Sequence, residues 1–138
     1  MLDENFFIET ALRSTVLSGL SDEDLESYRG PYPTRDSRRP LLQWPRAMPL
    51  DGEPADVVGR IETYDRWLAV SGEVPKLLLT FDASPTLMIG AEMSAWCAAN
   101  IANLEIEHCG AAAHLAPEDQ PDAIAAAIVG WADRHRLR

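Results

Sequence analysis

The chain has 138 residues, a formal net charge of −10 and 46% hydrophobic residues, a composition typical of a globular domain and not of a disordered chain. Its apolar runs are too short to cross a bilayer, and an acidic chain lacks the clustered lysines and arginines that neutralise nucleic-acid phosphates. We therefore expect neither a membrane nor a nucleic acid as partner.

The N-terminus and the cysteines bear on location. Residues 1–5 are acidic and do not form a secretory signal. The chain has two cysteines, Cys97 and Cys109, and a pair without a secretory signal favours reduced thiols over a disulfide. The sequence therefore predicts a cytoplasmic protein.

The first fifty residues predict short helices and loops. Ser21 is followed by three acidic residues, the pattern of a capped helix start, and Gly30 followed by Pro31 ends that helix. Five prolines between residues 30 and 50 predict irregular structure there, because neither a long helix nor a paired strand tolerates them.

From residue 54 onward helices and strands alternate. Apolar residues at helical spacing predict helices over 54–71, 90–100 and 120–135, and short apolar runs predict buried strands over 76–81 and 104–108. This alternation is typical of an α/β fold with a parallel sheet. Two strands are too few for an independent sheet of this kind, so the chain is expected to be part of something larger or to pair with another chain.

His114 is the first candidate for chemistry. It follows the second predicted strand, and ligands of open α/β sheets bind beyond the carboxyl ends of strands, where a histidine can serve as an acid or base. A surface loop histidine with no chemical role is the alternative.

Asp82 follows the first predicted strand and is the second candidate. A carboxylate there could orient an imidazole as the acid of a triad does, although an aspartate that only forms a turn fits the same position. Trp44, in the proline-rich segment, could donate its indole N–H into a pocket or simply anchor the loop.

Other site types find little support. A metal site built from His108, Cys109 and His114 is disfavoured, because neighbouring residues of a strand point to opposite faces. The serines lack the glycine context of a nucleophile elbow, and no glycine-rich phosphate loop is present.

An ordered series of motifs resembles the haloalkane dehalogenases and the related Renilla-type luciferases. The segments that carry the resemblance are residues 3–10 (DENFFIET), 20–32 (LSDEDLESYRGPY), 38–46 (RRPLLQWPR), 49–58 (PLDGEPADVV) and 74–78 (VPKLL), together with His114 and 118–122 (EDQPD). They correspond to the C-terminal half of that family.

The resemblance implies the C-terminal part of an α/β-hydrolase fold. Residues 1–53 would be the second part of a helical cap domain, and residues 54–138 would be the C-terminal part of the core, with its last two strands and flanking helices. Met1 falls where such enzymes have chain interior, so a truncated or mis-assigned gene is expected.

The family's reaction is hydrolytic dehalogenation without a metal or cofactor. An aspartate displaces halide to form an alkyl-enzyme ester, which a histidine-activated water hydrolyses. By resemblance His114 is the general base and Asp82 a candidate orienting acid. The positions matching the apolar pocket for a small halogenated substrate are Phe7, Ala11, Trp44, Pro45 and Met48.

This sequence also departs from the family. The nucleophilic aspartate and the halide-binding residues belong to the half that the chain does not match, so the isolated chain is expected to be inactive without a missing N-terminal half or a second chain. Leu115 to Pro117 replace an aromatic-containing segment after the histidine. An ester or epoxide hydrolase, a luciferase-like monooxygenase and a non-catalytic remnant are the alternatives.

Overall fold

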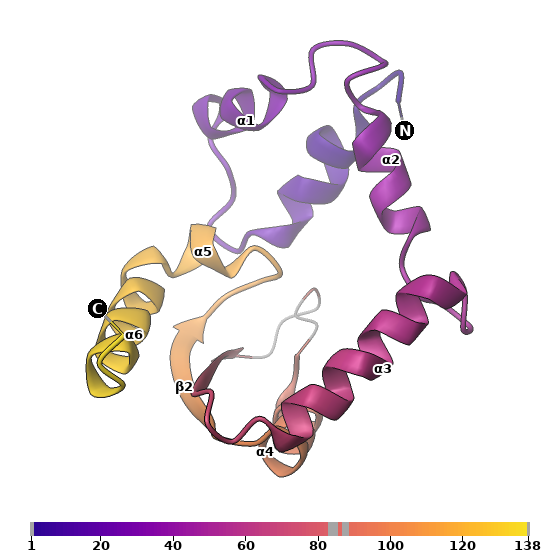
Figure 1. The fold of residues 1–138 in the computed structure, drawn as a ribbon. Coiled ribbons are helices and arrows are strands. Elements are labelled where there is room, and N and C mark those ends of the chain that lie inside the picture. The colour runs from indigo at the N-terminus through magenta and orange to yellow at the C-terminus, as the bar shows by residue number, and fades with distance from the viewer. Residues whose placement is uncertain (1, 83–85, 87–88, 138) are drawn as a thin grey trace. The chain divides into compact units, whose positions relative to one another are not determined.

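The computed structural model describes residues 2–82, 86 and 89–137. The chain divides into two compact units, Met1–Thr63 (unit 1) and Tyr64–Arg138 (unit 2), which are described separately (Figure 1). The division falls within one long helix, α3, Ala55–Val70. None of the helices in the described ranges is long and apolar enough to cross a membrane.

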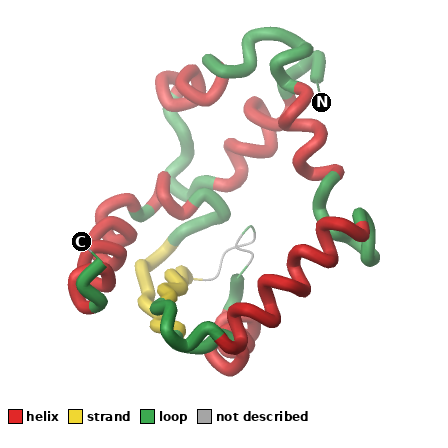
Figure 2. Tube along the Cα trace, viewed as in Figure 1, coloured by secondary structure: helices red, strands yellow, loops and turns green. Residues whose placement is uncertain are grey.

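Unit 1 consists of short helices joined by loops, as the sequence predicts (Figure 2). The described elements of this unit before α3 are the π-helix η1 (Phe7–Ala11), the 3-10 helix η2 (Leu12–Thr15), α1 (Asp22–Arg29) and α2 (Arg39–Arg46). Its most deeply buried side chains are Leu25 of α1 and Ile8 of η1, which are 0% and 2% exposed.

Helix α1 begins at the predicted cap. The Ser21 hydroxyl accepts from the Asp24 backbone N–H at 3.1 Å, and the Asp24 carboxylate accepts from the Ser21 backbone N–H at 2.9 Å. These reciprocal bonds form a capping box. The bond from the Ser21 hydroxyl lowers the pKa of the Asp24 carboxyl. Gly30 follows the last residue of the helix, so both predicted ends are confirmed.

The irregular structure expected over residues 30–50 is wrong for Arg39–Arg46, which form α2. Pro40 lies in the first turn, where a backbone N–H has no partner within the helix, so its ring costs no hydrogen bond. Pro45 lies in the last turn and removes only one backbone hydrogen bond of the helix. A short helix therefore accommodates prolines that a long one would not.

Unit 2 contains the predicted alternation. After α3 come β1 (Lys76–Asp82), α4 (Ala91–Asn100), β2 (Leu104–Ala111), α5 (Ala116–Asp119) and α6 (Pro121–Arg134). The two strands pair in parallel, with Lys76 opposite Leu104 and Thr80 opposite His108. Both predicted strands and the three predicted helices are confirmed.

The second strand is longer than the predicted segment, which ends at His108. Strand β2 continues to Ala111, and the register shifts between Thr80 and Asp82 so that Asp82 pairs with Ala111. Gly110 has φ +86, a left-handed conformation that favours glycine and lets the strand bend at this irregularity. The sequence reasoning ended the strand early and also missed α5.

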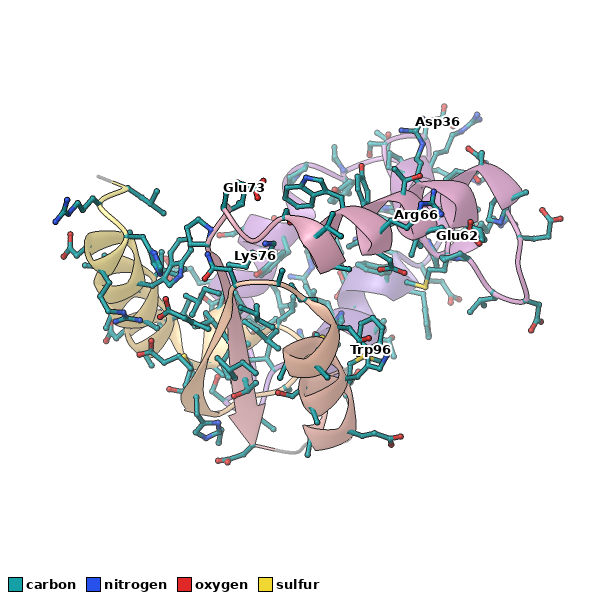
Figure 3. The ribbon with its side chains drawn as sticks, turned by 60° about the horizontal axis from the view of Figure 1, so that its bottom comes forward. Asp36, Glu62, Arg66, Glu73, Lys76 and Trp96 are labelled. Atoms are coloured by element: carbon teal, nitrogen blue, oxygen red, sulfur yellow. The ribbon has the colours of Figure 1, made fainter. Side chains whose placement is uncertain are left out.

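The chain's one lysine holds the start of β1. The Lys76 ammonium donates to the backbone carbonyls of Ser71, Val74 and Ala102, each at 2.8 Å, and lies 5.4 Å from the centroid of the Trp67 ring. Figure 3 labels Lys76 beside this end of the strand. One side chain thus ties together the end of α3, the loop before β1 and the loop before β2.

Helix α6 is fastened to β2 by charged groups. Arg134 donates to Glu105 at 2.9 Å and lies 3.8 Å from Glu107, and His135 also contacts the Glu105 carboxylate. The hydrogen bonds from Arg134, and then those from His135, lower the pKa of Glu105. The charged side chains of β2 on this face therefore have partners within unit 2.

Candidate functional site

His114 lies in the turn between β2 and α5, beyond the carboxyl end of the sheet. The two residues before it, Ala112 and Ala113, are 0% and 1% exposed, whereas His114 itself is exposed. Its backbone N–H donates to the Thr86 hydroxyl at 3.3 Å. The small buried alanines anchor the turn and leave the imidazole available for chemistry.

Two side chains from the segment after His114 hold its turn. The Asp119 carboxylate accepts from the Ala113 backbone N–H at 2.9 Å, and the Gln120 amide donates to the Ala111 carbonyl at 2.8 Å. The Gln120 side chain also packs beside Gly110, where an added Cβ would lie 3.6 Å from it. The Asp119 carboxylate thus holds the backbone of the residue that directly precedes His114.

The structure places Asp82 at the carboxyl end of β1, as predicted. The histidine beside it is His108, however, and not His114. The Oδ1 atom of Asp82 lies 3.3 Å from Nε2 of His108, and both side chains are more than half exposed. Within the described residues Asp82 makes this contact and none with His114. An exposed pair of this kind holds both groups only weakly.

The pocket candidates of unit 1 lie on two helical segments. Phe7 belongs to η1 and Trp44 to α2, and their ring centroids are 6.4 Å apart at an interplanar angle of 44°. Trp44 is 66% exposed, and Met48, which follows α2, is 47% exposed. Ala11 in η1 and Pro45 in α2 are half-buried. Unit 1 therefore presents an apolar surface around the Phe7–Trp44 pair.

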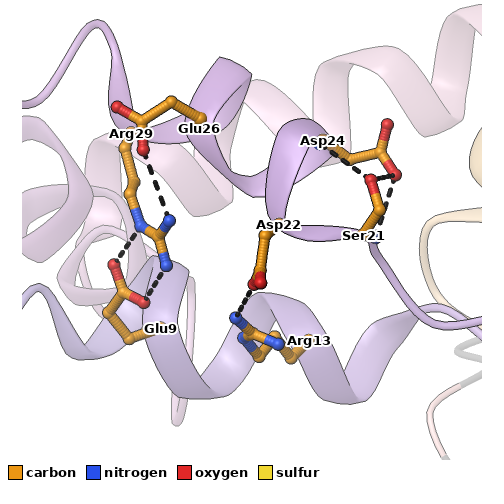
Figure 4. Close-up of polar contacts among 7 residues, drawn as sticks. All are labelled: Glu9, Arg13, Ser21, Asp22, Asp24, Glu26 and Arg29. Atoms are coloured by element: carbon orange, nitrogen blue, oxygen red, sulfur yellow. Dashed lines mark hydrogen bonds and ion pairs between the residues drawn. The ribbon is translucent and has the colours of Figure 1, made fainter.

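A salt bridge braces the helix that carries Phe7. The Arg29 guanidinium of α1 donates to both oxygens of Glu9 in η1 at 2.7 Å and contacts Glu26 at 3.4 Å (Figure 4). Hydrogen bonding to Arg29 lowers the pKa of the Glu9 carboxyl. The Glu9 and Arg29 side chains are 35% and 31% exposed, so solvent screens the pair only in part. This brace was missed in the sequence, where Glu9 and Arg29 give no periodic signal.

The remaining reactive groups are dispersed. Both cysteines are free and buried, Cys97 in α4 and Cys109 in β2, and burial raises the pKa of the Cys109 thiol. Over residues 2–82, 86 and 89–137, no cluster of three or more histidine, cysteine, aspartate or glutamate side chains is arranged to hold a metal ion.

The chain resembles curated enzymes over nearly its whole length. A haloalkane dehalogenase of Mesorhizobium japonicum is 39% identical over 131 residues, which are 95% of this chain and 41% of that enzyme. Haloalkane dehalogenases of Agrobacterium fabrum and Sphingobium indicum are 40% and 37% identical and are covered over 42% and 45% of their lengths. The chain thus spans less than half the length of these relatives. No family model matches it.

Solved structures agree with this similarity. The crystal structure of a haloalkane dehalogenase from Agrobacterium tumefaciens has a TM-score of 0.86 and 40% identity, covering 96% of this chain and 45% of that one. A putative ancestral haloalkane dehalogenase has a TM-score of 0.90 and 38% identity over 99% of this chain and 47% of that one. The predicted fold class, the C-terminal part of an α/β-hydrolase fold, is confirmed.

Proposed function

We propose that this chain, which is similar to haloalkane dehalogenases over the counterpart of their C-terminal half, is the part of a hydrolytic dehalogenase that carries the general base. The observation that carries the proposal is His114, held on an anchored turn beyond the carboxyl end of β2, in a chain 37–40% identical to haloalkane dehalogenases.

In the proposed reaction a carboxylate outside this chain attacks the carbon that bears the halogen. The carbon–halogen bond breaks, halide leaves, and an alkyl ester forms on that carboxylate. His114 then takes a proton from water as the water adds to the ester carbonyl, and collapse of the adduct releases the alcohol and restores the carboxylate. The His114 imidazolium finally loses its proton to solvent, so the net products are the alcohol, halide and a proton, and no oxidant or reductant is consumed.

Asp82 is retained in the proposal as a candidate orienting acid. Its position at the carboxyl end of β1 supports the role, and its contact with His108 is what it would have to exchange for one with His114. If Asp82 keeps His108 in the active enzyme, the acid must come from the part of the fold outside this chain.

The substrate class in the proposal is a small apolar haloalkane. Such a molecule offers almost nothing to hydrogen-bond, so an apolar wall suits it. Phe7, Ala11, Trp44, Pro45 and Met48 are proposed as that wall, supported by the aromatic pair and by the exposure of Trp44 and Met48. The two free cysteines support a reducing compartment, and we propose the cytoplasm.

The proposal is tested by combining this chain with the part of a relative that it does not match. The 138-residue chain is mixed or co-expressed with the portion of the Agrobacterium fabrum enzyme that it does not match, and bromide release from 1-bromobutane is measured. We expect release by the mixture, none by either part alone, and none when His114→Ala replaces the wild-type chain.

Two results would overturn the proposal. Turnover by the 138-residue chain alone would show that no other part is needed. A complex that hydrolyses an ester or an epoxide but releases no bromide would assign the chain to another class of hydrolase.

A further inference from the structure

A hollow of about 510 Å³ lies within unit 1, away from the groups used in the proposed function. Its walls come from the segment that leads into η1, from the end of α1 and from the loop that follows α1. Its volume falls in the range of pockets that take small organic molecules. None of its lining residues is among the proposed catalytic or substrate-binding residues, so the proposed function gives the hollow no role.

Asn5 contributes an unused hydrogen-bond acceptor to this hollow. It belongs to the lining and is 6% exposed, and its side-chain Oδ1 is buried with no hydrogen-bond partner within residues 2–82, 86 and 89–137. Its backbone carbonyl, in contrast, accepts from the N–H groups of Ile8 and Glu9, both at 3.0 Å. A buried acceptor without a donor destabilises the fold, so a molecule that donates to Oδ1 would remove this penalty.

The two arginines of the lining have their donors engaged. The Arg29 guanidinium donates to both oxygens of Glu9 at 2.7 Å and contacts Glu26 at 3.4 Å (Figure 4). The Arg38 guanidinium donates to four backbone carbonyls at 3.0 to 3.4 Å. Because these N–H groups are directed at oxygens of the protein, the hollow favours a ligand that donates hydrogen bonds over an anion that accepts them.

The acidic side chains of the hollow outnumber its basic ones. Four carboxylates and two guanidiniums line it, and Glu4 is among the acids that are exposed. Asp3 has a partner outside the lining in Arg35, at 2.9 Å. Glu26 shares the guanidinium of Arg29 with a second carboxylate. These pairings leave an excess of negative charge, which attracts a cation.

The size of the hollow and its donor requirement select the kind of cation. In the part of the chain that the structure describes, no cluster of three or more histidine, cysteine, aspartate or glutamate side chains is arranged to hold a metal ion. A primary ammonium group carries a positive charge and three N–H donors. Tyr32, which is half-buried, also belongs to the lining and offers apolar ring surface to an alkyl chain.

We propose that this hollow binds a primary alkylammonium ion, which donates a hydrogen bond to Oδ1 of Asn5 and is attracted by the carboxylates of Glu4 and Glu26. The site lies within unit 1 and does not rest on the proposed function.

The test titrates the ¹⁵N-labelled 138-residue chain with n-butylammonium chloride and follows the side-chain amide signals of Asn5 by NMR. We expect a saturable shift. The control is tetramethylammonium chloride, whose cation is an isomer with the same charge and no N–H donor. It should bind at least about tenfold more weakly, because it leaves Oδ1 without a partner.

Two substitutions of Asn5 separate its acceptor from its backbone. Asn5 has φ +47, a left-handed conformation that glycine adopts readily, so Asn5→Gly removes Oδ1 and keeps the turn. We expect Asn5→Gly to weaken butylammonium binding at least about tenfold, followed through the backbone amide of Gly30, which also lines the hollow. Asn5→Asp keeps an acceptor oxygen, adds a negative charge and should strengthen binding.

A matched pair of glutamates tests the charge. Glu4→Gln and Glu23→Gln each remove one negative charge from unit 1, and of the two residues Glu4 lines the hollow whereas Glu23 lies in the first turn of α1. Glu4→Gln should weaken binding at least about threefold, and Glu23→Gln less than about 1.5-fold. This pair and Asn5→Asp carry the test if Asn5→Gly does not fold.

Each contrary outcome overturns the proposal. Equal affinities for the two isomeric cations would mean that charge alone attracts them and that Oδ1 of Asn5 takes no part. A butylammonium titration that never saturates, weaker binding by Asn5→Asp, or equal effects of the two glutamate variants would each show that the hollow is not an alkylammonium site.

Discussion

The two units differ in how completely they bury their apolar side chains and pair their charged ones. Leu25 in unit 1 is 0% exposed and Glu9 binds Arg29 through both carboxylate oxygens. In unit 2 the apolar strand β1 has no buried residue, and Ile106 of β2 is 42% exposed. Unit 1 therefore has a small core and a bidentate ion pair of its own, although Trp44 and Met48 stay exposed on its surface, whereas the central apolar strand of unit 2 has no buried residue. The contrast distinguishes residues that stabilise the isolated chain from residues whose apolar surface is left uncovered.

The largest effect expected in the isolated chain comes from Leu25→Ala. Removing a fully buried leucine leaves a cavity, and the free energy of unfolding of unit 1 should fall by about 2–5 kcal/mol. Leu78→Ala in half-buried β1 should cost less than about 1.5 kcal/mol. Urea denaturation of both variants, followed by circular dichroism, tests the contrast, and equal costs would contradict it.

A second prediction concerns the turn of His114. Asp119→Ala leaves the N–H of buried Ala113 without its acceptor, which should cost about 1–2 kcal/mol and speed exchange of that amide. Asp122→Ala, an exposed acid in the first turn of α6, is the control. In the complemented enzyme Asp119→Ala should lower the rate of ester hydrolysis more than the rate of halide release. Equal loss in both steps would mean that Asp119 only supports folding.

Within unit 1 a smaller loss is expected at the start of α1. Ser21→Ala removes one half of the capping box and should cost about 1 kcal/mol. Ser18→Ala, which lies before the cap, should cost less. Thermal unfolding followed at 222 nm compares the two, and a Ser21→Ala melting temperature equal to that of wild type would show that the box contributes nothing.

The smallest expected effect is the pH dependence of the stability that the Glu9–Arg29 pair contributes. The pKa of Glu9 is lowered in the folded state, so the stability it contributes is present above the unfolded pKa, near 4.5, and is lost as pH falls through the folded value. Glu9→Gln should therefore be slightly less stable than wild type at pH 6, with the difference vanishing well below pH 4.5. A difference that stays constant with pH would contradict the assignment.

Local signals predicted the fold better than they predicted the site. The capped start at Ser21, the strand from Lys76 and the helix from Pro121 follow from caps, apolar runs and periodicity, which act over a few residues. The extension of β2 to Ala111 depends on a bulge opposite Asp82, which is a property of the strand pair.

The site depended more on contacts that the sequence does not encode locally. The position of His114 after a strand predicts its candidacy, whereas the apolar pocket residues of unit 1 follow only from the family resemblance. The bond from Ala113 to Asp119 and the proximity of Asp82 to His108 both depend on how turns fold back, so spacing alone did not indicate them. The assignment of residues 1–53 to a cap and 54–138 to a core stays a proposal.

The most direct test of the central claim, that this chain supplies the base to a nucleophile carried elsewhere, is the mass of each polypeptide after reaction. The complex of the His114→Ala chain with the unmatched portion of the Agrobacterium fabrum enzyme is mixed with 1-bromobutane. We predict about one bromide released per complex and a butyl adduct on the partner portion, because the ester forms but is not hydrolysed. A butyl adduct on the 138-residue chain, or continued turnover without His114, would contradict the account.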